Sequence, residues 1–117
     1  ASVVFTGSAG FNAGPPATSV YLATKAALNS LAKTLSRDLL ARRIRFNVVN
    51  PGGIETPGLG KAGMPIEVIR QMMSAQVPLG RLGRPDEITG YVLFLLSDQS
   101  TYILGTELSI DGGSTQL

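Results

Sequence analysis

Short apolar runs alternate along this chain with longer segments of helical periodicity. Residues 2–6, 44–50 and 106–110 are runs that contain β-branched or aromatic side chains, and glycine or proline follows each one closely. Such runs predict buried strands. Because segments with a helical pattern separate them, right-handed crossovers should place the three strands in parallel within one sheet. Residues 7–16, rich in Gly, Ala and Pro, predict a loop after the first strand.

The longest periodic segment lies between the first two predicted strands. Either Thr18 or Ser19 is a suitable N-cap, and the helix should continue to about Ala41. Its apolar positions repeat at helical spacing and predict a core face made of Val20, Ala27, Leu28, Leu31, Leu35 and Leu39. Another side carries small residues, which either permit the close approach of a second helix or form an ordinary solvated face. These small residues are Ala23, Ala26, Ser30 and Thr34.

The segment between the second and third strands predicts a lid and two shorter helices. Residues 57–65 hold three glycines and two prolines, so we expect a mobile lid without regular structure. Pro65 should begin a helix to about Gln76, whose apolar residues either line a substrate pocket or pack in the core: Ile66, Ile69, Met72 and Met73. Pro85, followed by two acids, should begin a helix to about Leu96. Its predicted buried residues are Ile88, Val92, Leu95 and Leu96.

The composition excludes several functional classes. Ten basic and eight acidic side chains give a net charge of +2, a balance that does not favour nucleic acid as a partner. The sequence has no cysteine and no histidine, so disulfides, thiolate metal sites and a Ser-His-Asp triad are excluded, and we expect no metal. We find no apolar run of membrane-spanning length and no secretory leader pattern, and therefore expect a soluble cytoplasmic protein.

Three residues near the first loop carry groups suited to proton transfer. Tyr21 and Lys25 are four residues apart, so a helix places both on one face with an offset of ~40°. A free tyrosine hydroxyl is a poor base at neutral pH because its pKa is about 10, and an ammonium held nearby favours the phenolate. Ser8 follows the first strand, where its hydroxyl can donate to an oxygen on which charge develops. Together these groups predict a proton-transfer site for a carbonyl/alcohol pair, although Tyr-x-x-x-Lys alone is also common on helices without such a role.

Further motifs surround this pair. A serine after a strand, Tyr-Leu-Ala-Thr-Lys-Ala-Ala opening a long helix and Asn-Pro-Gly-Gly-Ile-Glu-Thr after the next strand occur in this order, before Tyr-Ile-Leu-Gly-Thr-Glu-Leu-Ser-Ile-Asp-Gly-Gly. With these motifs, nearly the whole chain resembles the second half of a short-chain dehydrogenase/reductase. The resemblance implies an α/β fold, a partial Rossmann-like doubly wound parallel sheet of about three strands with flanking helices.

The resemblance also implies roles for individual residues. Tyr21 would be the acid/base catalyst, Lys25 would favour its phenolate and hold the nicotinamide ribose, and Ser8 would polarise the substrate oxygen. The cofactor, NAD or NADP, would lie against Tyr21, Lys25 and the segment after the second strand, at Pro51, Gly52, Ile54 and Thr56. By itself, that Pro-Gly-Gly turn would be typical of a simple strand end. The substrate would be a small carbonyl or alcohol, and proteins of this family are commonly dimers or tetramers.

One part of the family pattern has no counterpart in this sequence. Complete members begin with a βαβ unit whose glycine-rich loop binds the pyrophosphate, and no such unit precedes Ser8. We therefore expect residues 1–117 to be a single C-terminal portion of a Rossmann domain, with the N-terminal nucleotide-binding half absent. Without that half, the chain should bind dinucleotide weakly and should not turn over. The alternative to an oxidoreductase is a non-catalytic scaffold or association fragment.

Overall fold

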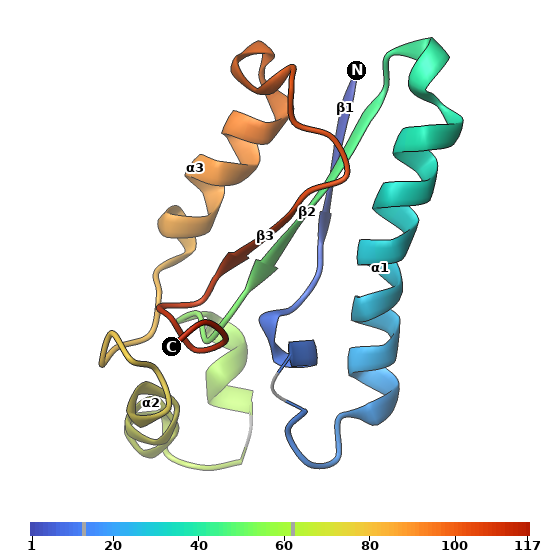
Figure 1. Ribbon diagram of the computed structural model, residues 1–117. Helices are drawn as coiled ribbons and strands as arrows, with labels where there is room; N and C mark the ends of the chain where they lie inside the picture. Colours follow the sequence, from blue (N-terminus) through green and yellow to red (C-terminus); the bar gives the residue numbers. More distant parts are fainter. Residues whose placement is uncertain (13, 62) are drawn as a thin grey trace.

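Three parallel strands form the centre of the structure, in the order β1-β2-β3 (Figure 1). The computed structural model describes residues 1–12, 14–61 and 63–117. In it, β1 is Ser2–Thr6, β2 is Arg45–Pro51 and β3 is Glu107–Ile110. Both strand pairs are parallel, with Thr6 opposite Val49 and Pro51 opposite Ile110. The carboxyl ends of all three strands therefore lie at one edge of the sheet, where ligands bind in open α/β sheets.

Helices cover both faces of this sheet, which confirms the predicted doubly wound α/β arrangement. α1 (Ser19–Asp38) and α3 (Pro85–Leu96) flank the strands on opposite sides, and α2 (Ile66–Ala75) lies beyond the carboxyl ends of the strands (Figure 1). Among the described residues, four short 3-10 helices occupy the connections: Ala9–Asn12, Leu40–Arg42, Pro57–Lys61 and Asp98–Ser100. In the described part of the chain, no helix combines the length and the apolar character needed to cross a membrane.

The apolar core lies between α1 and the sheet. Successive residues of a strand point to opposite faces, and on β2 it is Phe46 and Val48 that pack against Ala32 of α1. The Phe46 ring also meets the Phe5 ring of β1, with centroids 6.0 Å apart. Further partly buried apolar residues close this cluster: Val3, Leu35, Leu39 and Ile44.

Polar groups hold α3 on the other face of β2. The buried Arg45 guanidinium donates to the Ser97 carbonyl at 3.0 Å, to Ser100 Oγ at 3.1 Å and to the Ile103 carbonyl at 3.3 Å. These acceptors lie at and just beyond the carboxyl end of α3, where helix carbonyls lack intrahelical partners and a cation is favoured. Asn47, also buried, donates to the Ile103 carbonyl and accepts from the Thr106 amide.

The predicted core face of α1 was only partly right. The buried residues of this helix are Leu22, Asn29, Ala32 and Ser36. Leu28, Leu35 and Leu39 are partly buried, the last two against the core. Val20 is 78% exposed and Leu31 43% exposed, and Ala27 is also exposed, so half of the predicted apolar stripe faces away from the sheet. The reason is that two polar residues on the buried side, Asn29 and Ser36, find hydrogen-bond partners on β2, while the small Ala32 lets the helix approach closely.

Several element ends and local details also differ from the predictions. α1 ends at Asp38 instead of Ala41. Thr18 occupies its N-cap without a side-chain cap, and Thr18 Oγ1 donates to the Pro15 carbonyl. The predicted lid, residues 57–65, contains the 3-10 helix Pro57–Lys61, and Ala62 lies outside the described residues. Within α3 only Leu95 is buried, whereas Leu96 is exposed because it lies on the outer side of the last turn.

Candidate functional site

A pocket of about 580 Å³ opens at the carboxyl ends of the strands. All residues that the sequence singled out line it: Ser8, Tyr21, Lys25, Pro51, Gly52, Ile54 and Thr56. They come from three separate segments, namely the residues just after β1, the first two turns of α1, and the end of β2 with the loop that follows it. The fold therefore gathers side chains that are up to 48 positions apart in sequence, from Ser8 to Thr56, around one cavity.

Tyr21 and Lys25 lie on the first turns of α1. Lys25 Nζ is 5.7 Å from the centre of the Tyr21 ring, a cation–π distance. The same ammonium donates to the Thr6 carbonyl at 3.0 Å, which ties this part of α1 to the end of β1. Tyr21 is 53% exposed, and no hydrogen bond to its hydroxyl is found among the described residues. Its phenol is therefore accessible to a ligand that enters the pocket.

Ser8 stands two residues beyond β1 and is partly buried. Its Oγ accepts a hydrogen bond from the Gly10 amide at 3.2 Å, within the first turn of the 3-10 helix Ala9–Asn12. The hydroxyl hydrogen remains available to an acceptor in the pocket, because Oγ uses only a lone pair in this contact.

Backbone contacts on two sides fix the loop that follows β2. The Gly52 amide donates to the Ile110 carbonyl at 2.9 Å, and a Cβ on Gly52 would lie 2.6 Å from the Cβ of Asp111, closer than such atoms ever approach. On the other side, the Glu55 amide donates to the Gly83 carbonyl and the Gly83 amide donates to the Gly53 carbonyl, each at 2.9 Å. The close approach of β3 therefore requires glycine at position 52, a reason that the sequence did not reveal.

An ion-pair cluster holds α2 against this loop. Arg70 of α2 donates through Nε to Glu55 at 2.8 Å and also pairs with Glu67 one turn earlier. Hydrogen bonds from these two carboxylates, first Glu55 and then Glu67, raise the pKa of the Arg70 guanidinium. Met73, one turn further along α2, lines the pocket, whereas Met72 points out and is 55% exposed.

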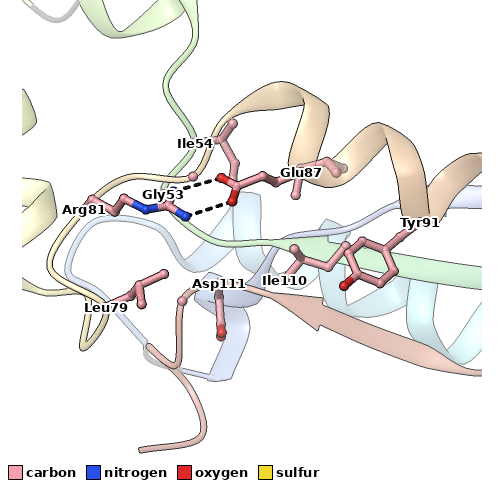
Figure 2. A pocket seen from close by; sticks show the side chains of 11 residues that line it. Gly53, Ile54, Leu79, Arg81, Glu87, Tyr91, Ile110 and Asp111 are labelled. Carbon is pink, nitrogen blue, oxygen red and sulfur yellow. Dashed lines mark hydrogen bonds and ion pairs between the residues drawn. The ribbon is translucent and has the colours of Figure 1, made fainter.

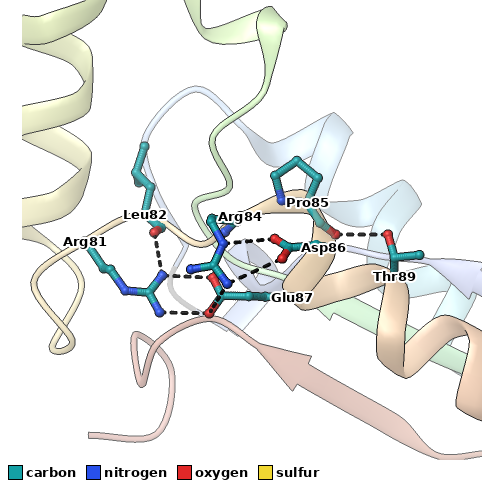
Figure 3. A network of polar contacts seen from close by, with 7 residues as sticks. All are labelled: Arg81, Leu82, Arg84, Pro85, Asp86, Glu87 and Thr89. Carbon is teal, nitrogen blue, oxygen red and sulfur yellow. Dashed lines mark hydrogen bonds and ion pairs between the residues drawn. The ribbon is translucent and has the colours of Figure 1, made fainter.

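A second pocket, of about 280 Å³, shares Gly53, Ile54 and Ile88 with the first (Figure 2). Its charged groups are engaged with neighbouring protein groups. Arg81 forms two hydrogen bonds of 2.8 Å to the Glu87 carboxylate (Figure 3). Asp111 accepts from the Gly113 amide at 3.0 Å and the Thr115 amide at 3.1 Å.

Glu87 also caps α3. Its carboxylate accepts from the Arg84 amide at 2.8 Å, in the geometry of a capping box, while Arg84 pairs with Asp86 (Figure 3). The hydrogen bonds from Arg81 and from the Arg84 backbone lower the pKa of Glu87 from 4.5 to about 2. The same carboxylate raises the pKa of Arg81. The cluster thus fixes the start of α3 beside both pockets.

Sequence reasoning missed the wall that α3 contributes to the first pocket. Pro85, Ile88, Thr89 and Val92 line it. Their spacing, one helix face over two turns, was a signal that could have found them, but the apolar members were assigned to the core. In the structure Ile88 and Val92 are only partly buried.

The arrangement has a definite chemical capacity. A tyrosine hydroxyl, an ammonium and a serine hydroxyl can each donate to a substrate oxygen, and the tyrosine can also exchange a proton with it. Within residues 1–12, 14–61 and 63–117, no group of three or more carboxylate, imidazole or thiol side chains is placed to hold a metal ion. The apolar surfaces of Ile54, Met73 and Val92 complete a pocket suited to a planar ring or a hydrocarbon.

A family model, curated relatives and solved structures all resemble this chain. A family model described as Enoyl-(Acyl carrier protein) reductase matches residues 1–115. The chain is 43% identical over 100 residues to the 3-oxoacyl-[acyl-carrier-protein] reductase of Thermotoga maritima and 42% identical over 101 residues to the 3alpha-hydroxysteroid dehydrogenase of Mediterraneibacter gnavus. Each alignment covers 86% of this chain and 39% of the relative.

A solved structure also resembles the whole chain. It is a short chain dehydrogenase family protein from Francisella tularensis, with a TM-score of 0.89 and 33% sequence identity. The match covers 100% of this chain and 52% of that chain. This chain therefore spans about half the length of the solved structure and less than half the length of the two curated relatives.

Proposed function

Because the chain belongs to the short-chain dehydrogenase/reductase family, we propose that it is the catalytic half of an NAD(P)-dependent oxidoreductase acting on a carbonyl/alcohol pair. The observation that carries the proposal is the pocket in which Ser8, Tyr21 and Lys25 meet the loop after β2. Of the described pockets, this is the one that brings together a tyrosine hydroxyl, an ammonium and a serine hydroxyl.

The three side chains divide the chemistry of the proposed reaction. Tyr21 gives its hydroxyl proton to the substrate oxygen during reduction and takes it back during oxidation. Lys25 lies 5.7 Å from the Tyr21 ring and stabilises the phenolate that forms when the proton leaves. Ser8 donates its hydroxyl hydrogen to the same substrate oxygen and stabilises the charge that develops there.

The loop after β2 and α1 together suit the nicotinamide end of NAD or NADP. Lys25 and Thr56 offer hydrogen-bond donors at the pocket, as ribose and carboxamide oxygens require, and Ile54 and Val92 offer apolar surface to a planar ring. When bound, the nicotinamide supplies or accepts the hydride. The residues of the chain align the substrate oxygen and move the proton. Pro51 and Gly52 complete the loop, and backbone bonds to β3 and Gly83 hold it in place.

The proposed substrate is a small molecule with a carbonyl or hydroxyl group. The curated relatives named above act, by their names, on a 3-oxoacyl group carried by a protein and on a 3alpha-hydroxysteroid. These compounds share only the oxidisable or reducible oxygen function. The proposal for this chain is therefore limited to that function, together with a pocket wall of which Ile54, Met73 and Val92 are apolar members.

We also propose that the protein assembles into a homo-oligomer, a dimer or tetramer. Val20, Ala27 and Leu31 lie exposed on the side of α1 that faces away from the sheet. Burying such an apolar stripe against a second helix removes it from water. Sedimentation of the full-length protein should show a species heavier than one chain, and a single-chain mass at high concentration would contradict this part of the proposal.

Replacing Tyr21 by phenylalanine tests the proposed reaction. In the full-length protein, Tyr21→Phe removes the transferable proton, so kcat should fall by at least ~100-fold, the scale of general acid–base catalysis. Tyr91→Phe is the matched control, because Tyr91 lines the second pocket and is 50% exposed. Its kcat should be unchanged. The assay follows NAD(P)H absorbance with a panel of aldehydes, ketones and alcohols. Full activity in Tyr21→Phe would remove this residue from the mechanism, and NAD(P) binding without any turnover in the wild type would favour the non-catalytic alternative.

A further inference from the structure

Two buried polar bridges join α1 to β2, and they differ in how completely they are paired. In the first, Ser36 Oγ donates to the Phe46 carbonyl at 3.0 Å and accepts from the Phe46 amide at 3.2 Å. In the second, Asn50 Nδ2 donates to Asn29 Oδ1 at 3.3 Å. The first bridge satisfies every group that it involves. The second leaves Asn29 Nδ2 and Asn50 Oδ1 buried without a hydrogen-bond partner among the described residues.

Incomplete pairing makes the second bridge a poor source of stability. Asn29 is 5% exposed and Asn50 is fully buried, so both carboxamides are removed from bulk solvent. A buried unpaired polar atom costs about as much as a hydrogen bond contributes. Stability alone therefore does not account for two asparagines at this place.

The location of the bridge gives a different reason. Tyr21, Lys25 and Asn29 follow one another at four-residue intervals on a single face of α1. Lys25 binds the carbonyl of Thr6 at the end of β1, and one turn later Asn29 binds Asn50 at the end of β2. Consecutive turns of one helix thus hold the carboxyl ends of two adjacent strands.

Asn50 also touches the segment that carries the serine. A Cβ on Gly7 would overlap Asn50 Oδ1, so the carboxamide lies directly against the backbone before Ser8. On its own strand, Asn50 immediately precedes Pro51 and Gly52 of the loop that lines the pocket. Its side chain is therefore in contact with or adjacent to all three segments that supply the site.

We propose that Asn29 and Asn50 are positioning residues for the reaction proposed above: their amide bridge fixes the Tyr21–Lys25 face of α1 relative to Ser8 and to the loop after β2. The inference rests on the proposed function. A hydrogen bond is directional, so the asparagine bridge sets the position of α1 one turn beyond Lys25, at the end of the helix that carries the site, whereas the Ser36 bridge holds the helix about two turns further away. Misplacement of catalytic groups by about 1 Å can reduce a rate ~100-fold.

The test compares the two bridges in the full-length protein. Asn29→Leu, Asn50→Leu and the double variant remove the second bridge, and Ser36→Ala removes the first. Each single asparagine variant should lower kcat by ~10- to 100-fold with little change in KM, and should alter the pH dependence of kcat. The double variant leaves no orphaned amide, so its unfolding midpoint in urea should recover, but its kcat should stay low. Ser36→Ala should lower the unfolding midpoint and leave kcat and its pH dependence unchanged.

Two results would overturn the positioning role. One is a kcat that follows the unfolding midpoint across all four variants, and the other is a double variant with wild-type kcat. If a leucine variant does not fold, Asn50→Ser removes the bridge with a smaller polar side chain and should show the same loss of kcat. Tyr21→Phe in the same assay separates the claims. Loss of activity there with full activity in Asn29→Leu contradicts only the positioning role, whereas full activity in Tyr21→Phe contradicts the proposed function.

Discussion

The two pockets that meet at Gly53 and Ile54 use their charged and polar groups in opposite ways. In the smaller pocket, Arg81 is bound to Glu87 by two hydrogen bonds of 2.8 Å, and Asp111 accepts from nearby backbone amides. In the larger pocket, Lys25 makes one bond to a backbone carbonyl and stands over the Tyr21 ring. An ammonium has three donors, so two remain for a ligand. The charged groups of the smaller pocket are thus bound to protein partners, whereas the ammonium of the larger pocket keeps donors for a ligand.

The two pockets lie side by side because the start of α3 contributes to both of them. Glu87 and its arginine partners fix the first turn of α3, and the next residues of that helix, Ile88 and Thr89, line the larger pocket. Gly83 belongs to the same connection and forms a bridge with Ile54. The cluster of Arg81, Arg84, Asp86 and Glu87 therefore supports one wall of the larger pocket. The charged side chains hold the backbone at the start of α3, and they do so by pairing with one another and with the Arg84 amide.

Removing one cation from each pocket tests this difference most directly. Lys25→Met should lower kcat/KM by at least ~100-fold in the full-length protein, because the ammonium is the cation placed against Tyr21. Arg81→Met, which removes the cation that is paired with Glu87, should change kcat/KM by less than about 3-fold and act mainly on stability. Steady-state kinetics of both variants with the same substrate make the measurement. Equal losses of kcat/KM in the two variants would show that Arg81 contributes to the reaction even though it is paired with Glu87.

A glycine between the pockets allows a test on stability. Gly52 lines the larger pocket and presses against Asp111, which lines the smaller one. Gly52→Ala should lower the free energy of unfolding by about 1–3 kcal/mol, because the added methyl group meets the Asp111 backbone and the end of β3 must move. Gly60→Ala is the control, since a Cβ there meets nothing within 4 Å. Urea unfolding curves of the two variants would be compared, and a Gly52→Ala curve equal to that of Gly60→Ala would mean that the contact is not rigid.

The smallest expected effect concerns the stability that the Arg81–Glu87 ion pair contributes at low pH. The pKa of Glu87 is lowered in the folded protein from 4.5 to about 2, so its ion pair contributes stability above pH 4.5 that is lost as the pH falls toward 2. Glu87→Gln should therefore be less stable than the wild type at neutral pH, and the difference should shrink between pH 4.5 and 2. Asp86→Asn, at a more exposed carboxylate, is the control. Urea midpoints measured across this range would refute the prediction if wild type and Glu87→Gln changed in parallel.

The sequence predicted the strands and the placement of Tyr21 and Lys25 on one helix face well, because each depends on local order. The spacing of Tyr21 and Lys25 needs only one helix, and the three apolar runs give strands at nearly the predicted residues. Parallel pairing followed from the long connections. The membership of the pocket was also anticipated, since strand ends and the loops after them converge at one edge of a parallel sheet.

The features that the sequence did not reveal are contacts between elements, because each depends on which partner a residue meets in the folded chain. Apolar periodicity pointed to Val20 and Leu31 as core residues of α1, yet the helix buries Asn29 and Ser36 instead. A polar residue becomes a core residue only when another element supplies its hydrogen bond, and Phe46 and Asn50 are distant in sequence. In the same way, the pocket wall of α3 and the buried Arg45 could be recognised only after β2 and α3 had been placed.

The order of the strands has a consequence for the folding kinetics of the site. Neighbouring strands of this sheet are joined only through long crossovers, from Thr6 to Arg45 and from Pro51 to Glu107. The entropy cost of closing each long loop comes before the strand pairing can stabilise the chain. Parallel sheets of this kind therefore fold slowly compared with helical bundles. Ser8, Tyr21 and the loop after β2 can meet only once the first crossover has closed, and that loop gains its hydrogen bond to Ile110 only after the second. An intermediate with α1 formed but β3 undocked would thus carry the tyrosine and the lysine in the right spacing and still have no organised pocket.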